Sequence, residues 1–430
     1  MSEAVWTSGA AGLRGLRPYP EYRYCGVEWL GEIPAHWDVK RLKYVSTFND
    51  EALPDSTSED DEIVYVDISS VDAVEGITLK ERMAFADAPS RARRIVRNGD
   101  VIVSTIRTYL RAIAPICDPE PNLIVSTGFA VVRSGDDLDS SFAAYALRAP
   151  YFVDRVVAHS EGVSYPAINA SDMACLPIAF PSVEEQRAIA AFLDRETGKI
   201  DALVAKKEQL IELLQEKCTA LITRAVTKGL DSNVPMKDSG VEWLGEIPAH
   251  WEVKALKRLA AMRAGTAIIS NEIEPTGDFP VFGGNGIRGY TSSFTHEGEF
   301  PLIGRQGALC GCVNFASGRF WASEHAVVAT PGPDVDPHWL AHLLQAMSLN
   351  AYSQSAAQPG LAVETIGAIP APAPYTEEQQ AIAAFLDQET AKINALITKV
   401  HDAIDRLKEL RTALISTAVA GKIDVREEAA

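Results

Sequence analysis

Two stretches of this 430-residue chain concentrate side chains suited to binding phosphate groups or the edges of nucleic-acid bases. The first, Lys80–Arg111, holds eight basic residues against three acidic ones. Arginine carries a planar fork of donors that fits phosphate oxygens and guanine edges. The candidate contacts here are Arg91, Arg93, Arg94, Arg107, Tyr109 and Arg111. The alternative, which stays open, is a solvated surface whose arginines pair with nearby acids.

The second stretch is rich in glycine and spans Phe282–Tyr290, with Ile303–Gly307 and Arg319–Trp321 further along. Glycine permits tight turns and a close approach of the backbone to a ligand. The signal is weak by itself, because any β-rich domain needs turns. The polar residues that could read bases or phosphates here are Asn285, Arg288, Tyr290, Arg305, Gln306 and Arg319.

The overall charge argues against a simple nucleic-acid binder. The chain holds 40 basic and 58 acidic residues, a net charge of −18, whereas neutralising phosphates needs positive charge. Binding to DNA would therefore rest on local patches or on a partner that supplies positive charge.

The catalytic motifs that would indicate an enzyme are missing from the sequence. It contains no P-loop, no H-E-x-x-H and no G-x-S-x-G, and Cys310-x-Cys312 lacks a second ligand pair. We therefore expect no catalytic residues, no metal site and no cofactor in this chain. Scattered cysteines, no signal-peptide pattern and no long apolar run predict a cytoplasmic protein without a membrane span.

A duplication organises the chain. Gly26–Trp37 and Gly240–Trp251 share the letters GVEWLGEIPAHW, and Glu184–Asp194 (EEQRAIAAFLD) recurs as Glu377–Asp387 (EEQQAIAAFLD). The stretches between these blocks look unrelated, so a repeated frame holds two different inserts. We interpret the repeated tryptophans as packing anchors and the histidines beside them as structural.

Each second block opens a long helix. Ser182-x-x-Glu185 and Thr376-x-x-Gln379 match the capping box, and apolar residues then alternate at spacings of four and three, which is typical of a coiled coil. Helices of roughly 40 residues would be roughly 60 Å long, and each would bury its stripe against the other in an antiparallel pair. Glu196 and Glu389 fall on this seam, either fixing its register or lying at a frayed edge. The expected seam includes Ile200, Leu203, Leu210, Leu214, Ile393, Leu396, Val400, Leu407 and Leu410.

The inserts mix short strand-like runs with turns and one helix-like run each. The fold class that follows is α+β, with two globular mixed α/β domains, two long helices forming an antiparallel coiled coil, and an internal pseudo-two-fold repeat. The expected divisions are an N-terminal arm and first repeat (1–40), a first recognition domain (41–181), a first long helix (182–230), a second repeat (231–254), a second recognition domain (255–374), a second long helix (375–422) and a tail (423–430).

The duplicated order of frame, variable insert and helix resembles the specificity subunit of type I restriction–modification systems. The resemblance covers essentially the whole chain and is carried by Glu185-Gln186, Ile189–Leu193 and Lys199–Asp201, with their copies from Glu378 and Lys392. It implies that each insert reads one half of a bipartite site in double-stranded DNA. It also implies that the helices set the spacing and dock methyltransferase subunits, two of them expected, and restriction/translocase subunits. Those partners would hold S-adenosylmethionine, ATP and Mg²⁺.

Two other hypotheses stand beside this one. A coiled-coil scaffold could use its inserts to bind proteins or small molecules. An enzyme with a cleft between the inserts is least favoured, because the catalytic motifs are missing.

Overall fold

The computed structural model describes residues 17–162, 165–307, 310–353 and 360–426. The chain divides into two compact units: unit 1 comprises residues 1–206 and 402–430, and unit 2 comprises residues 207–401. Parts of the expected N-terminal arm (1–16) and tail (427–430) lie outside the described residues. Among the helices within those described ranges, none has the combined length and apolar character needed to cross a membrane.

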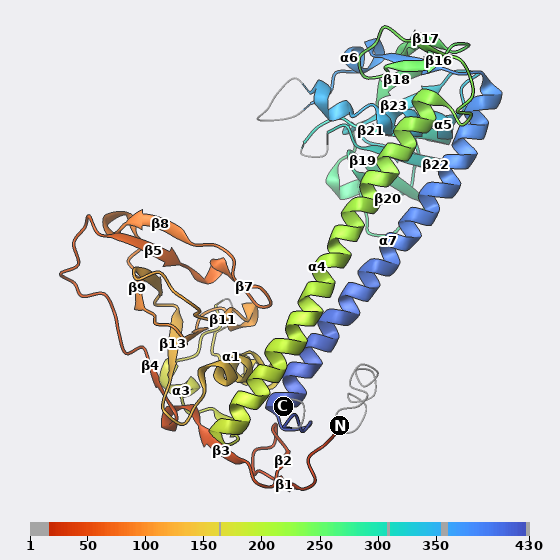
Figure 1. Cartoon of the computed structure of the whole chain (residues 1–430). Helices are drawn as coiled ribbons and strands as arrows, with labels where there is room; N and C mark the ends of the chain where they lie inside the picture. Colours follow the sequence, from red (N-terminus) through yellow and green to blue (C-terminus); the bar gives the residue numbers. More distant parts are fainter. Residues whose placement is uncertain (1–16, 163–164, 308–309, 354–359, 427–430) are drawn as a thin grey trace. The chain divides into compact units, whose positions relative to one another are not determined.

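Two long helices belong to both units, α4 (Val183–Lys228) and α7 (Thr376–Val419), drawn in green and blue in Figure 1. The Ser182 hydroxyl accepts the Glu185 N–H at 3.3 Å, which is one half of the expected capping box. The capping box predicted for Thr376 and Gln379 at the start of the second long helix was wrong. Thr376 is already the first residue of α7, and its hydroxyl donates to the Asp334 carbonyl at 3.0 Å.

Within each unit the two helices run antiparallel. In unit 1, Ile189 and Leu193 near the start of α4 share one core with Leu414 and Ala418 near the end of α7. In unit 2, the core joins the end of α4 with the start of α7. A bidentate ion pair adds to the contact in unit 1, where Arg411 Nε and Nη2 lie 2.9 and 3.3 Å from the carboxylate oxygens of Asp201.

The predicted seam was wrong at three of its nine named residues. Leu203, Leu210 and Leu396 are 43%, 40% and 44% exposed, while Ile211, next to Leu210, and Ile404, between Val400 and Leu407, are buried. Because adjacent residues such as Leu210 and Ile211 are both apolar, the sequence fits a step of three or of four equally well. The seam takes the step of four. Among the other six named residues, Leu214, Ile393 and Val400 are buried, and Ile200, Leu407 and Leu410 are half-buried.

The same shift removes two glutamates from the seam. Glu196 pairs with Lys199 at 2.8 Å and Glu389 with Lys392 at 2.6 Å, each on the surface of its own helix. Thr197 takes the seam position beside Glu196 and is 4% exposed. The glutamates therefore do not set the register of the helix pair.

The recognition domain of unit 1 contains two four-stranded sheets, followed by two short helices that replace the single helix expected over 139–159. The first sheet has the order β11-β10-β13-β4, with β4 Ser46–Phe48, β10 Val101–Ser104, β11 Ile113–Pro115 and β13 Phe129–Ser134. The second has the order β8-β5-β12-β9, with β5 Glu62–Val66, β8 Glu81–Ala84, β9 Ala92–Ile95 and β12 Leu123–Ser126. The helices are α1 (Ser140–Arg148) and α2 (Pro150–Ala158), followed by the single turn α3 (Ala170–Met173).

The recognition domain of unit 2 is built on one six-stranded sheet of order β18-β23-β21-β22-β19-β20. Its strands are β18 Ala260–Ala264, β19 Phe279–Gly283, β20 Gly286–Thr291, β21 His296–Gly304, β22 Val313–Ala322 and β23 Ala326–Pro331. The helices are α5 (Pro337–Ala346) and α6 (Val363–Ala368). The two inserts therefore differ in fold as well as in sequence.

Two-stranded sheets join each recognition domain to the repeated frame. In unit 1, β3 (Asp38–Arg41) pairs with β14 (Pro177–Phe180), and in unit 2, β17 (Glu252–Ala255) pairs with β24 (Pro370–Ala373). The repeated segments also form small hairpins: β1 (Tyr22–Tyr24) with β2 (Glu32–Pro34), and β15 (Met236–Asp238) with β16 (Glu246–Pro248). Trp37 and Trp251 are 0% and 1% exposed, as expected of packing anchors. The fold class predicted from the sequence is confirmed.

Candidate nucleic-acid interface

Four of the seven arginines in the basic stretch of unit 1 pair with acids, which supports the alternative interpretation for these residues. Arg91 lies 2.7 Å from Asp67, and Arg97 lies 2.6 Å from Glu51. Arg82 contacts both Glu62 and Glu120. A hydrogen bond from Arg91 to Tyr65, together with the Asp67 carboxylate, raises the pKa of the Arg91 guanidinium above its usual value. These contacts offset part of the local positive charge that the sequence shows.

Three arginines of this stretch differ from the others. Among the residues that the structure describes, Arg93, Arg94 and Arg107 have no acidic group within 4.0 Å. Arg93 and Arg94 are half-buried in β9, and the Arg93 guanidinium lies 4.8 Å from the ring of Phe85. Of the three, Arg107 alone is exposed, so it is the most accessible unpaired cation among them.

Arg107, Tyr109 and Arg111 lie together in the Tyr109 turn, which we define as Thr105–Arg111, between β10 and β11. Tyr109 is 53% exposed, and the Arg107 guanidinium lies 4.8 Å from the ring of Tyr165. Backbone bonds link this turn to the edge that carries Arg91, since Thr105 donates to Gly128 and Thr127 donates to Arg91. Four of the six candidates in this domain therefore fall on neighbouring loops.

In unit 2, four candidates gather at the tip of the β19–β20 hairpin. Asn285 lies in the two-residue turn, and the stem of Arg288 lies over Gly283, where an added Cβ would meet Arg288 Cδ at 2.4 Å. The backbone of Gly284 approaches the carbonyl oxygens of Gln306 and His325. We call Asn285, Arg288, Arg305 and Gln306 the hairpin-tip patch. The glycines here allow other parts of the same chain to pack closely against the hairpin. The sequence did not distinguish this role from contact with a ligand.

Tyr290 and Arg319 lie elsewhere in the same domain. Tyr290 exchanges backbone hydrogen bonds with Glu274 and lines a recess with Glu272 and Asp278. Arg319 pairs with Glu297 at 3.1 Å and lies 4.9 Å from the ring of Phe294. The acids around both residues make them weaker candidates for phosphate contacts than the hairpin-tip patch.

The repeated EEQ motif clamps each recognition domain to its long helix. Gln186 is 0% exposed, its amide oxygen accepts the Asp139 N–H at 2.8 Å, and its amide nitrogen donates to the carbonyls of Asp137 and Pro181. Gln379 repeats all three contacts with Asp336, Asp334 and Pro374. Asp139 and Asp336 in turn cap the N-termini of α1 and α5.

The aspartate that ends the FLD motif forms a second clamp. In unit 1, Tyr145 of α1 donates to Asp194 at 2.7 Å, and burial raises the pKa of this phenol to about 12. In unit 2, His342 of α5 contacts Asp387 at 2.8 Å and His338 contacts it at 3.0 Å. The frame thus repeats the carboxylate, while each insert supplies its own partner. Residue-by-residue motif searching missed these clamps, although the exact repetition of the blocks was a signal for them.

The histidines of the repeated hairpins bind the first turn of each long helix. His36 Nε2 lies 3.1 Å from Glu185, and His250 Nε2 lies 3.0 Å from Glu378. Tyr19 also donates to Glu185 at 2.7 Å, and its burial, followed by this bond, raises the pKa of the phenol. The repeated histidines therefore have the structural role expected of them.

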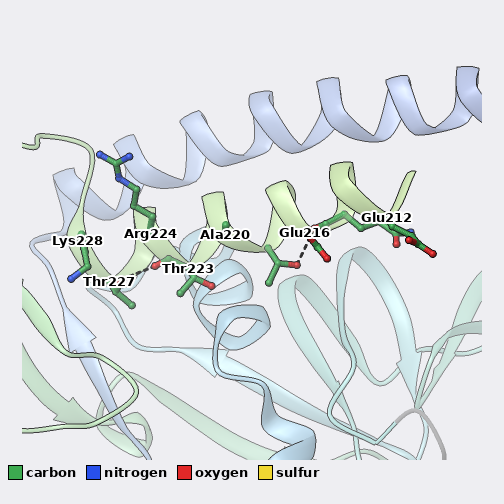
Figure 2. Close-up of a pocket in the computed structure, with 9 residues that line it drawn as sticks. Glu212, Glu216, Ala220, Thr223, Arg224, Thr227 and Lys228 are labelled. Carbon is green, nitrogen blue, oxygen red and sulfur yellow. Dashed lines mark hydrogen bonds between the residues drawn. The ribbon is translucent and has the colours of Figure 1, made fainter. Parts of the chain in front are cut away.

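A shallow groove runs along α4 within unit 2 (Figure 2). Glu212 and Glu216 lie toward one end and Arg224 and Lys228 toward the other. The Thr219 and Thr227 hydroxyls donate to carbonyls one turn back along the helix, so these side chains already have hydrogen-bond partners. All nine lining residues come from one helix, and such an open surface suits a protein partner better than a small molecule.

The described residues include no cluster of three or more His, Cys, Asp or Glu side chains that could hold a metal ion. The candidate residues present exposed guanidinium and amide groups on two different domains, each clamped to the paired helices.

Comparison with known families identifies this arrangement. The family model for the type I restriction modification DNA specificity domain matches residues 34–213 and 248–406. This chain belongs to that family. The two matches cover both inserts and the first part of each long helix, so each half of this specificity-family chain carries one such domain.

Individual relatives show how unevenly the similarity is distributed. The EcoprrI specificity subunit of Escherichia coli is 45% identical over 147 residues, which cover 33% of this chain and 37% of that protein. The putative subunit S.HindORF215P of Haemophilus influenzae is 29% identical over 126 residues, which cover 29% of this chain and 33% of that protein. The MjaVIII specificity subunit of Methanocaldococcus jannaschii is 22% identical over 331 residues, or 71% of this chain and 75% of that protein. The two stronger matches thus span about a third of the relatives' length.

Solved structures support the fold. A chain from a study of complex assembly and conformational transition of the type I R-M system has a TM-score of 0.72 at 23% identity, covering 90% of this chain and 98% of that one. The HsdS subunit from Thermoanaerobacter tengcongensis has a TM-score of 0.51 at 23% identity, covering 91% of this chain and 98% of that one. At this level of identity the likeness concerns fold alone.

Proposed function

We propose that this chain is the non-catalytic DNA-reading subunit of a type I restriction–modification complex, with each recognition domain reading one half of a bipartite target. The observation that carries the proposal is the attachment of two unlike domains to one repeated frame by the same Gln and Asp clamps. A duplicated frame with divergent inserts suits one task performed on two different half-sites.

In this proposal the Tyr109 turn and the hairpin-tip patch make the principal DNA contacts. Arginine and asparagine or glutamine recognise guanine and adenine edges through paired hydrogen bonds, and both surfaces present such groups. The net charge of −18 is compatible with this role if the partner subunits enclose the rest of the duplex.

Sequencing the methylated bases in a host that carries the complex tests this proposal directly. Replacing residues 41–181 with another insert is expected to change one half of the methylated motif and leave the other half intact. A change in both halves would contradict the assignment of one domain to each half-site. Adding a heptad to both α4 and α7 should alter the unread gap between the halves, and an unchanged gap would contradict a spacing role for the helices.

Single substitutions can test the contacts themselves. Arg107→Ala should weaken DNA binding and reduce its salt dependence, because each phosphate contact releases counterions. Arg82→Ala is the matched control, since Arg82 already pairs with Glu62 and Glu120. Equal losses in both variants would remove Arg107 from the interface.

We further propose that the paired helices dock the methyltransferase subunits, on which S-adenosylmethionine would be held. Leu210, Leu213 and Leu396 are 40%, 55% and 44% exposed on the helices of unit 2. Leu213→Glu should abolish co-purification with the methyltransferase subunit. Ile269→Glu is the control, because Ile269 is 64% exposed in the recognition domain of the same unit. Retention of the partner by the Leu213 variant would refute docking at this surface.

A further inference from the structure

We propose that the Tyr109 turn of unit 1 is a wedge that inserts an apolar side chain between two stacked base pairs of the DNA. This inference rests on the proposed DNA-reading function and goes beyond it, because it adds deformation of the duplex to the contacts already described. Its observations are the backbone of the turn, the side chains that it projects and the cations beside them.

The backbone of the turn is strained and firmly held. Arg107 and Arg111 both adopt the left-handed conformation, with φ of 54°, on either side of the single helical turn Thr108–Leu110. Non-glycine residues seldom adopt this conformation unless the surrounding structure imposes it, and such strain gathers at functional sites. Thr108 supplies the anchor, since it is 2% exposed and its hydroxyl lies 2.8 Å from that of Ser160.

Further bonds hold the first half of the turn. The Arg107 N–H donates to the Pro166 carbonyl at 2.8 Å, and the Ser104 hydroxyl donates to the Ile106 carbonyl at 2.6 Å. A rigid support of this kind is what a wedge requires, because an inserted side chain must resist the restacking of the bases.

Three large apolar or aromatic side chains of this turn, and Tyr165 beside Arg107, are exposed to solvent. Ile106, Tyr109, Leu110 and Tyr165 are 40%, 53%, 43% and 62% exposed. Tyr109 and Leu110 are consecutive and occupy the crest of the turn. Side chains of this type enter base steps in proteins that kink DNA, and an aromatic ring can also stack on a base.

The charges beside the crest favour DNA over a protein partner. Arg107 has no acidic partner among the described residues and lies against Tyr165. Arg111 pairs with Asp154 at 3.0 Å, but both side chains are more than half exposed, at 51% and 61%. Water and salt screen such a pair, so Arg111 can exchange Asp154 for a phosphate. Two guanidinium groups thus flank an apolar crest, matching the phosphates on either side of a base step.

The test uses the full chain assembled with its methyltransferase subunit and a duplex carrying the motif found by methylome sequencing. 2-Aminopurine is placed singly at each position of the half-site read by unit 1, because its fluorescence rises when the base loses its stacking. The methylated base is left unmodified, since methyltransferases extrude their target base. The wild-type complex should increase the fluorescence at one step of this half-site.

Tyr109→Ala and Leu110→Ala, singly and together, should remove that increase at a protein concentration that saturates the duplex. Tyr44→Ala is the control, because Tyr44 is 72% exposed outside the turn and its loss should leave the signal unchanged. An increase that survives in the double variant, or no increase at any step with the wild type, overturns the wedge.

Two further outcomes separate this inference from its alternatives. Loss of the methyltransferase subunit from the double variant in the absence of DNA would make the crest a protein contact and would also overturn the wedge. Equal binding of the wild-type complex to target and scrambled duplexes would instead overturn the proposed function, whereas specific binding without unstacking refutes the wedge alone.

Discussion

Replacing Gln186 with alanine should destabilise unit 1 without altering any of the proposed DNA contacts. The side chain is 0% exposed and makes three hydrogen bonds, to the Asp139 N–H at 2.8 Å and to the carbonyls of Asp137 and Pro181 at 3.0 and 2.9 Å. Alanine leaves all three of these backbone groups without their hydrogen-bond partner. The Asp139 amide then lies at the N-cap of α1 with no acceptor.

The expected loss follows from these contacts. A buried donor or acceptor that loses its partner costs about 1–3 kcal/mol, and carbonyls tolerate the loss better than amides. One amide and two carbonyls therefore lead to a decrease of about 2–4 kcal/mol in the free energy of unfolding of unit 1. Gln379→Ala should cause a similar loss in unit 2, because Gln379 makes the same three contacts.

Urea denaturation followed by circular dichroism measures this loss, with Gln209→Ala as the matched control. Gln209 is an exposed glutamine on the same helix, and its replacement should change the free energy of unfolding by less than about 0.5 kcal/mol. If Gln186→Ala were no more destabilising than Gln209→Ala, the clamp would hold nothing in place, and the reasoning from buried hydrogen bonds would be refuted.

Three further predictions test other parts of the structure. Ile211→Ala should cost about 2–4 kcal/mol and Leu210→Ala less than about 1 kcal/mol, because Ile211 is 7% and Leu210 40% exposed; equal losses in urea denaturation would contradict the observed seam. Burial raises the pKa of Tyr145 to about 12 from its ordinary value of 10.0, so the neutral phenol is favoured in the folded state. Its stabilising contribution is complete below pH 10 and is lost as the pH rises toward about 12, so the wild-type chain should show a larger alkaline loss of stability than Tyr145→Phe. A chain opened between residues 230 and 235, with residue 426 linked to residue 17, should still fold by circular dichroism, because Asp424 and Arg17 already form a β-bridge; an unfolded product would show that the native order of the segments is essential.

The duplication made most of the architecture predictable. Identical blocks required identical local structures, and the apolar rhythm after each block required long helices. The exact seam was not predictable, because pairs such as Leu210 and Ile211 offer two apolar neighbours at one step of the heptad. Only the position of the partner helix decides which of them is buried.

The candidate contacts show a different limit. Counting charges along Lys80–Arg111 treats every arginine alike, but Arg82, Arg91 and Arg97 meet acids that are distant in the sequence. Ion pairs between strands depend on register, which the sequence alone does not define. Tyr109 was found from its residue type, whereas the strain that displays it appears only in the backbone angles.

The clamps also define what any exchanged recognition domain must bring with it. The frame supplies Gln186 and Asp194 in one copy and Gln379 and Asp387 in the other. Each insert supplies two groups that bind these residues. One is an aspartate at the N-cap of its helix, and the other is a hydrogen-bonding side chain at the sixth helical position, which is Tyr145 in α1 and His342 in α5. A transplanted domain with both groups should fold onto the helices, whereas one with leucine at the sixth position would leave the frame aspartate without this partner. The test compares the free energies of unfolding of the two transplants, each measured against its own Gln→Ala variant. It shows whether the frame aspartate requires a hydrogen-bonding partner from the insert. If both fold equally well, the frame accepts any domain of suitable shape, and the repeated aspartate has another role.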